Sequence, residues 1–212
     1  MLNPYELLYL QQCMNYAEKF IGQSIRRVHF NETIHHHEKI FSIFQPHTEW
    51  ISKGKAGVPV ELGLNTCILE DQYGFILHHQ VMVGQTDDGV AVPMVEQTKA
   101  RFPTLKQCSF DQGFYSPNNR SKLRGLLDLS ILPSKGRRSK QEEAFETSDA
   151  FVVARRQHAS VESAINALEV HGLDRCLDHG IDGFKRYVAL AVVARNIQKV
   201  GALLQKKEAK AH

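Results

Sequence analysis

Cys108-Ser109-Phe110-Asp111-Gln112-Gly113-Phe114-Tyr115-Ser116 carries the most information in this chain. An apolar run ends there at one acidic residue, Asp111, and a glycine turn and a helix start follow at once. A carboxylate at the C-terminal edge of a strand points out of the sheet, where a metal ion or a phosphate can reach it. Asp111 could instead cap the helix that begins near Ser116.

A second carboxylate, Glu162, lies 51 positions further on (162 − 111) in a strongly helical segment. It could serve the same site as Asp111, or it could be a solvated residue paired with Arg155 or Arg156. His158 lies one helical turn before it and could orient it, contact DNA or simply be exposed. Convergence of the two acids is not readable from their positions alone.

The composition is that of an ordinary soluble domain with room for a core. The 212 residues are 42% hydrophobic and 23% charged, with a net charge of +3. Four cysteines, at positions 13, 67, 108 and 176, have no CxxC spacing, so we expect reduced, buried thiols in a cytoplasmic protein. We see no apolar run of the ~18 residues that a membrane span needs and no signal peptide, so we predict no membrane association.

Apolar spacing predicts strands that alternate with helices. We expect strands at 40–44, 60–69, 75–83, 105–110 and 129–132, and helices at 4–24, 90–102, 117–127, 150–170 and 181–204. The strands at 60–69 and 75–83 form an antiparallel hairpin, Asp87 or Asp88 caps the helix at 90–102, and residues 133–148 form a loop. The order β-β-β-α-β-α-β-α-α predicts an α/β fold with one mixed sheet flanked by helices.

Two predicted helices have broad apolar faces. In the helix at 4–24 the face contains Leu7, Leu8, Leu10, Cys13, Met14, Ala17, Phe20 and Ile21. Something must cover it, and we expect a partner segment upstream. In the helix at 181–204 we expect the apolar face to be buried, and we expect the charged tail from Lys206 to fray.

Several motifs in order resemble one family over about three quarters of the chain. They are Lys39-Ile40-Phe41-Ser42-Ile43-Phe44, Lys53-Gly54-Lys55, Pro59-Val60-Glu61-Leu62-Gly63, Phe110-Asp111-Gln112-Gly113-Phe114, Val161-Glu162-Ser163, His171-Gly172-Leu173-Asp174-Arg175 and Ala194-Arg195-Asn196-Ile197. Together they resemble the catalytic domain of a bacterial insertion-sequence transposase of the DDE class. The resemblance implies a ribonuclease H-like fold, DNA strand cleavage and strand transfer at a two-metal Mg²⁺ or Mn²⁺ site, and a homo-oligomeric complex with transposon ends and target DNA at the nucleoid.

The resemblance also assigns roles to single residues. Asp111 becomes the second catalytic acid and metal ligand, and Glu162 the third. The first acid is expected just after the run 40–44, where the chain has Gln45. A neutral amide brings no charge to a Mg²⁺ site, so either Glu49 is the first ligand, if the first strand runs longer, or the site is a two-acid remnant.

The chain departs from the family in two further ways. Gln112 stands where the family usually has Arg or Lys, and complete members are about twice as long, with a helical DNA-end-recognition region upstream. We therefore expect a truncated copy, with residues 1–37 left from the upstream region, 38–204 as the catalytic domain and 205–212 as a charged tail.

Basic residues occur in three clusters: Lys53 and Lys55; Lys135, Arg137, Arg138 and Lys140; and Arg155 and Arg156. Such charges are commonly a solvated surface, but contact with DNA phosphates is the functional interpretation, and we favour it for the cluster that follows the strand at 129–132.

Three functions remain open after these observations. The first is an active metal-dependent transposase domain, and the second is an inactive remnant that still binds DNA. The third is a DNA-binding or interaction protein of another family, which helix–turn–helix spacing would favour; we find no such spacing.

Overall fold

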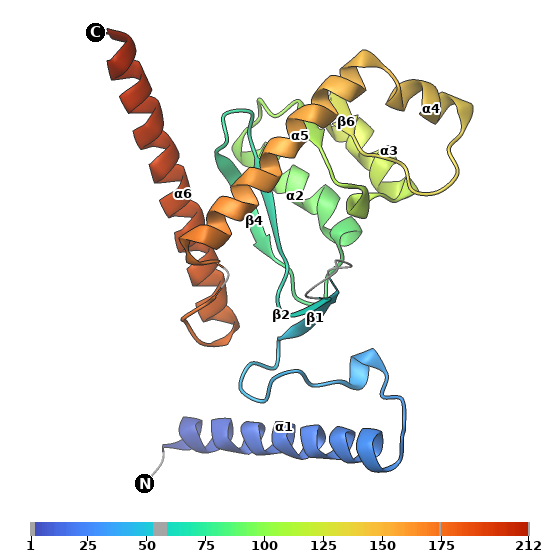
Figure 1. Cartoon of the computed structure of the whole chain (residues 1–212), viewed down its shortest axis with the longest axis vertical. Helices are drawn as coiled ribbons and strands as arrows, with labels where there is room; N and C mark the ends of the chain where they lie inside the picture. Colours follow the sequence, from blue (N-terminus) through green and yellow to red (C-terminus); the bar gives the residue numbers. More distant parts are fainter. Residues whose placement is uncertain (1–2, 53–58, 174, 212) are drawn as a thin grey trace. The chain divides into compact units, whose positions relative to one another are not determined.

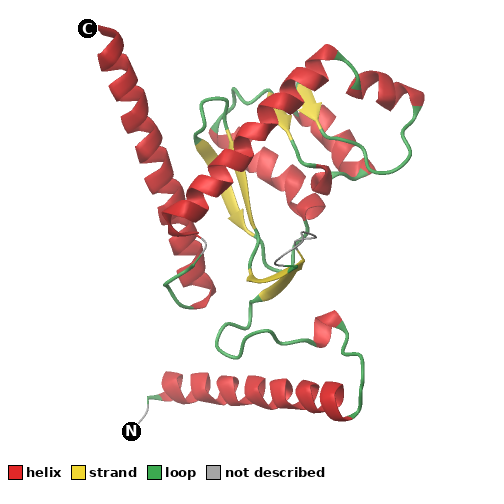
Figure 2. Cartoon of the chain, viewed as in Figure 1, coloured by secondary structure: helices red, strands yellow, loops and turns green. Residues whose placement is uncertain are grey.

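The computed structural model describes residues 3–52, 59–173 and 175–211, and leaves out the side chains of 159–163 and 171. The architecture is mixed α/β (Figures 1 and 2). The described elements run, in order, α1 (Pro4–His29), η1 (His36–Glu38), β1 (Glu49–Ser52), β2 (Val60–Gly63), β3 (Thr66–Glu70), β4 (Ile76–Val81), α2 (Asp87–Arg101), β5 (Gln107–Ser109), η2 (Gln112–Phe114), α3 (Pro117–Leu126), β6 (Leu129–Ile131), α4 (Lys140–Glu146), α5 (Asp149–Leu168), η3 (Glu169–Leu173) and α6 (Gly180–Ala211).

The chain divides into two compact units. The first contains Met1–Asn65 with His179–Ile181, and the second contains Thr66–Asp178 with Asp182–His212. Residues 38–65, which we predict to belong to the catalytic domain, therefore lie in the first unit. The functional boundaries at 37/38 and 204/205 stay predictions.

Helix α1 begins at a reciprocal cap and is longer than predicted. The Asn3 side chain accepts a hydrogen bond from the Glu6 backbone N–H at 2.9 Å, and the Glu6 carboxylate accepts one from the Asn3 N–H at 2.8 Å. Pro4 occupies the first turn, where its missing N–H costs nothing. The helix continues to His29, and none of its residues is buried.

The strand predicted at Ile40–Phe44 is wrong. Both backbone groups of Ile40 bond to the side chain of Gln23, at 2.9 and 3.1 Å, so they are not available to a neighbouring strand. Phe44 is 68% exposed. The first strand is instead β1, which pairs antiparallel with β2 in the register Glu49↔Gly63 to Ser52↔Val60.

The hairpin of the second unit is confirmed in position and orientation. Strands β3 and β4 pair antiparallel, and Asp71 closes their turn by accepting the N–H groups of Tyr73 and Phe75, each at 2.9 Å. Gly74 has φ +81°, a conformation that glycine adopts without strain. The single strand predicted over 60–69 is wrong, because β2 and β3 belong to different two-stranded sheets.

The core of the second unit lies on both faces of this hairpin. Side chains alternate along β3: Cys67 and Leu69 join the main cluster with α2 and α3, whereas Ile68 packs in a second cluster with Leu168 and Val192. The main cluster also contains the fully buried Val95 and Leu123. Burial of this kind is the dominant stabilising term for the unit.

Strands β5 and β6 pair in parallel, with Ser109 opposite Ile131. Helix α3 connects them and packs against β6, which makes a β–α–β unit. The hydrogen bonds of the described strands form three separate two-stranded sheets. The one mixed sheet that the sequence predicts is therefore not observed among them. The α/β class itself is confirmed.

Helix boundaries differ from the predictions at several places. Helix α2 begins at Asp87 after Thr86, so Asp87 and Asp88 lie in its first turn and are not its cap. Helix α4 lies inside the segment predicted as a loop, where Ser139 and Glu142 form a capping box. The predicted helices at 117–127 and 150–170 correspond to α3 and α5.

Helix α6 is longer and more exposed than predicted. It extends to Ala211, so the tail from Lys206 is helical over its described length. Val188 and Val192 are buried, but Leu190 is 68% exposed and Ile197 65% exposed. By length and composition alone α6 would suffice to cross a membrane, a property that core helices of soluble proteins share.

Asn196 fixes α6 to the hairpin. Its side-chain amide accepts the N–H of Ile76 and donates to the Ile76 carbonyl, both at 2.9 Å. These bonds satisfy both backbone groups of Ile76 at the start of β4. The motif Ala194–Ile197 thus has a structural role that its sequence alone did not indicate.

The prediction that all four cysteines are buried is wrong for three of them. All four are free; Cys67 is buried and the other three are half-buried. Burial raises the pKa of the Cys67 and Cys108 thiols to about 12, which keeps both protonated and unreactive.

Candidate active site

Asp111 lies at the carboxyl end of β5, as predicted. The ladder with β6 continues one residue past the strand, where the Phe110 N–H donates to the Ile131 carbonyl at 2.9 Å. Asp111 follows at the N-cap position of η2, but its side chain caps no backbone group. Ser116 caps α3 instead, accepting the Asn119 N–H at 3.2 Å. The alternative that Asp111 caps this helix is therefore wrong, and its carboxylate is 76% exposed.

Helix α5 brings an imidazole to this carboxylate. His158 Nε2 lies 3.2 Å from Asp111 Oδ1, and the His158 side chain is only 20% exposed. Because α5 packs against both β5 and β6, the histidine is held beside the strand end.

Glu162 lies in α5 four positions after His158, about one helical turn. Its side chain falls outside the described part of the structure. The location of the residue in a helix is confirmed, and its convergence with Asp111 stays a prediction.

The structure adds a carboxylate whose position in the sequence predicts only a possible helix cap. Asp87, in the first turn of α2, lies against Gly113: a Cβ added to that glycine would be 2.5 Å from Asp87 Oδ2. Burial and the charge of Asp111 raise the pKa of Asp87, and the charge of Lys135 partly opposes this shift. The available signal in the sequence was Gly113, two positions after Asp111, since a glycine permits close approach by another side chain.

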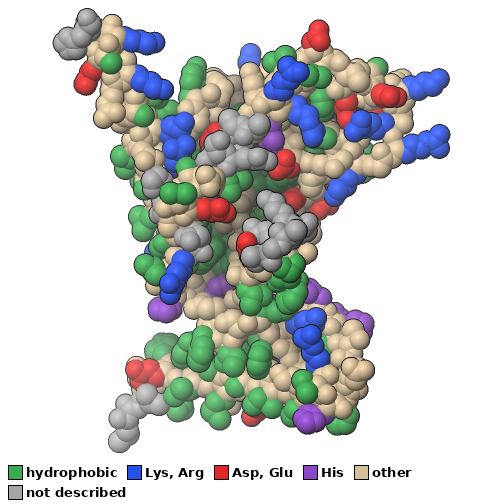
Figure 3. Space-filling view, viewed as in Figure 1, with side chains coloured by type: hydrophobic (Ala, Val, Ile, Leu, Met, Phe, Trp, Pro, Cys, Tyr) green, Lys and Arg blue, Asp and Glu red, His purple; other side chains and the backbone are tan. Residues whose placement is uncertain are grey.

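The basic loop follows β6 at the same edge as Asp111, because the carboxyl ends of parallel strands coincide. Lys135, Arg137, Arg138 and Lys140 are all exposed, and Figure 3 shows Lys and Arg side chains projecting from the surface around α4. Arg155 and Arg156 are exposed on α5. Lys53 and Lys55, the remaining predicted cluster, lie outside the described residues.

The buried carboxylate of Glu146 holds this loop at Ser134, where the loop starts, and at Arg138. The Glu146 carboxylate accepts hydrogen bonds from the Ser134 N–H at 2.8 Å and the Ser134 hydroxyl at 2.5 Å. Arg120 and Arg138 pair with it at 3.3 and 3.2 Å. Burial alone would raise the pKa of Glu146, but the Ser134 bonds and the two arginines outweigh burial and hold this pKa below its usual range.

The two candidates for the first acid lie in the first unit. Gln45 follows no strand; its backbone N–H donates to Ser42 Oγ at 3.1 Å, and its side-chain oxygen accepts the Gly180 N–H at 3.2 Å. Glu49 opens β1 and is half-buried, so the extension of the first strand through 40–49 is wrong. Neither residue stands at the carboxyl end of a strand.

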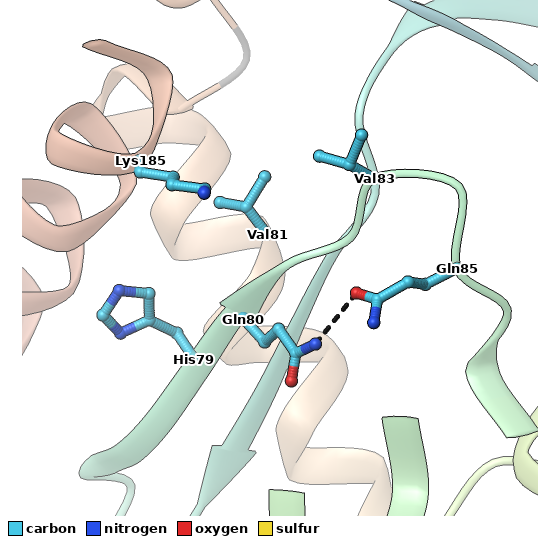
Figure 4. Close-up of a pocket in the computed structure, with 6 residues that line it drawn as sticks. All are labelled: His79, Gln80, Val81, Val83, Gln85 and Lys185. Carbon is cyan, nitrogen blue, oxygen red and sulfur yellow. Dashed lines mark hydrogen bonds between the residues drawn. The ribbon is translucent and has the colours of Figure 1, made fainter. Parts of the chain in front are cut away.

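A hollow of about 450 Å³ lies elsewhere in the second unit, beside β4 (Figure 4). Two residues of its lining are joined by a hydrogen bond of 2.9 Å, which Gln80 donates to Gln85. Its lining residues are His79, Gln80, Val81, Val83, Gln85 and Lys185. None is a carboxylate, so these residues offer no ligand set for the predicted metal chemistry.

The oxygen donors at the strand end are of the kind that Mg²⁺ and Mn²⁺ prefer, and Asp111 is open to solvent. Within the described residues, however, His, Cys, Asp and Glu form no group of three that could hold a metal ion. A complete ligand set would therefore need Glu162 or another group.

Comparisons of the chain with protein-family models, curated proteins and solved structures give no match.

Proposed function

We propose that this chain is a ribonuclease H-like DDE transposase domain that cleaves and transfers DNA strands. The observation that carries the proposal is the exposed carboxylate of Asp111 at the carboxyl end of a parallel strand pair, with a basic loop leaving the same edge. The order hairpin, α2, β5, α3, β6 in the second unit supports the proposed fold.

The residues at this edge of the strand pair would have different roles in the reaction. Mg²⁺ or Mn²⁺ held by Asp111 and Glu162 would activate the attacking oxygen and stabilise the leaving one. His158 holds the Asp111 carboxylate in place. The exposed cations of the loop, and Arg155 and Arg156, would neutralise phosphates of transposon-end and target DNA.

A second candidate function, a remnant that binds DNA without cutting it, is favoured by Gln45. Its amide oxygen is used by a backbone N–H and carries no negative charge. Two acids without a third would hold divalent cations weakly, while the phosphate-binding surface would be unaffected.

The test is a nicking assay on DNA with Mg²⁺ or Mn²⁺. We expect wild-type activity to fall at least about 100-fold in Asp111→Asn, because a neutral amide replaces a ligand. Asp128→Asn is the matched control, since Asp128 is an exposed acid at the opposite end of the same strand pair. Equal activity in wild type and Asp111→Asn would refute the proposal.

Two further variants separate the candidates. An inactive wild type that gains activity in Gln45→Asp identifies the remnant. An active wild type that loses activity in Glu49→Gln makes Glu49 the first acid. An inactive wild type that Gln45→Asp does not rescue, and that shows no salt-dependent DNA binding, rejects both.

A further inference from the structure

Helix α1 has an apolar stripe with heptad spacing, and all of its apolar members except Ala17 are exposed. Its members, which we call the seam, follow steps of three and four residues: Leu7, Leu10, Met14, Ala17, Ile21 and Val28. Ser24 occupies the remaining position. Leu7, Met14 and Ile21 are 62%, 57% and 57% exposed, and Val28 is 75% exposed. Figure 3 shows hydrophobic side chains on the surface of this helix.

Such a stripe is typical of a helix that pairs with another helix. Residues repeating every 3.5 positions stay in line along a supercoiled pair and insert into the partner's gaps. The 26 residues of α1 span about 39 Å, which is long enough for three such repeats. The opposite side of the helix already has a partner, because Gln23 and Arg26 bond to Ile40, Glu32 and Glu38 of the same unit.

We propose that the seam is the docking surface for α1 of a second copy of this chain, in antiparallel orientation. Antiparallel pairing places Met14 opposite Ala17 of the second copy and Ile21 opposite its Leu10. In that register Glu6, which flanks the seam near the start of α1, faces Arg27 of the second copy near its end, twice by symmetry.

Charge decides the orientation. In parallel pairing Glu6 would face Gln11 and Cys13 would face Glu18, so no opposite charges meet. The antiparallel pair also places the acidic first turn of one helix beside the basic last turn of the other, which contains Arg26, Arg27 and His29. The two helix dipoles then point in opposite directions, which is a favourable arrangement. Because the same surface serves both copies, it is complementary to itself and needs no other protein.

The first test is sedimentation equilibrium of the full chain without DNA. We expect a dimer at about 100 μM, and Met14→Lys should weaken self-association by about tenfold or more, because two ammonium groups enter the seam. Leu8→Lys is the matched control: Leu8 is 70% exposed on the same helix but off the seam. A monomeric wild type would overturn the proposal and would mean that another segment covers the seam. Equal weakening of self-association by Met14→Lys and Leu8→Lys would overturn it too.

The second test fixes the orientation with a short bis-maleimide crosslinker. Cys13 faces Phe20 of the second copy in the antiparallel pair and Glu18 in the parallel one. Phe20→Cys should raise the yield of crosslinked dimer above wild type, and Glu18→Cys should not. The reverse result rejects the antiparallel arrangement. Circular dichroism of each variant shows that the helix is retained, so a loss of dimer is not a loss of fold.

Discussion

Asp111 and Asp87 are two carboxylates with different surroundings. Both residues are exposed, but Asp111 has an imidazole 3.2 Å away, whereas Asp87 lies against Gly113. The charge of Asp111 acts on Asp87 and raises its pKa.

Asp111→Asn should lower the pKa of Asp87, since the variant removes a negative charge and leaves the burial. Carboxyl ¹³C NMR titration measures this shift, with Asp128→Asn as the control that should leave it unchanged. Because Asp87 has a raised pKa in the folded state, its contribution to stability falls as pH rises above the ordinary aspartate value of about 3.9. An unchanged titration of Asp87 in Asp111→Asn would contradict the coupling.

Among the secondary-structure elements, α4 shows how a polar segment becomes ordered. Its charged sequence predicts a loop, but a capping box starts the helix and the buried carboxylate of Glu146 holds its end against Ser134 and Arg120. The basic loop is therefore anchored at Ser134 and by Arg138, which limits where its cations can lie.

Glu146→Gln should destabilise the protein by about 2 kcal/mol or more at pH 7, because Arg120 and Ser134 lose a charged acceptor in a buried place. The lowered pKa of Glu146 means that its stabilisation is present above its unfolded pKa and is lost as pH falls through the folded pKa. Urea unfolding at pH 7 and pH 3 should show the difference shrinking. Glu143→Gln, an exposed acid of the same helix, should have little effect at either pH.

Asn196→Ala should loosen α6 from the hairpin. Both backbone groups of Ile76 lose their partner, and we expect a cost of about 2 kcal/mol with faster hydrogen exchange at the Ile76 amide. Gln198→Ala changes an exposed residue of the same helix and serves as the control. Unchanged exchange at Ile76 would show that the pair does not hold the two elements together.

At the scale of the whole chain, the proposed function depends on where the positively charged side chains cluster. The net charge of +3 is small, so overall attraction to DNA is weak and local clusters must supply the binding. The loop after β6 is the cluster that shares an edge with Asp111.

Replacing Lys135, Arg137 and Lys140 together by Ala should weaken DNA binding and lower the salt slope of log K by up to about 3, near one unit per lost phosphate contact. Arg138 is kept because it pairs with Glu146. Fluorescence anisotropy across a salt series measures the slope. The triple replacement of Lys206, Lys207 and Lys210 at the end of α6 removes the same charge, and an equal loss there would refute a specific role for the loop.

Local patterns predicted much of the second unit but, in the first unit, only helix α1. The hairpin, α3, β6 and the position of Asp111 follow from turn chemistry, a proline at a helix start and apolar alternation, all of which act between near neighbours in sequence. Ile40–Phe44 has the pattern of a strand, but the side chain of Gln23 takes its backbone bonds. A contact over 17 residues cannot be read from local spacing.

The amino-acid order alone therefore determined the α/β class, the hairpin, and an acid at the end of a strand followed by glycine, because each depends on interactions within a few residues. Only the tertiary structure brought His158 and Asp87 to Asp111, ordered α4 around Glu146, and left the apolar stripe of α1 exposed. Those outcomes depend on packing between segments far apart in the chain, where burial and charge act through space and leave no local periodicity.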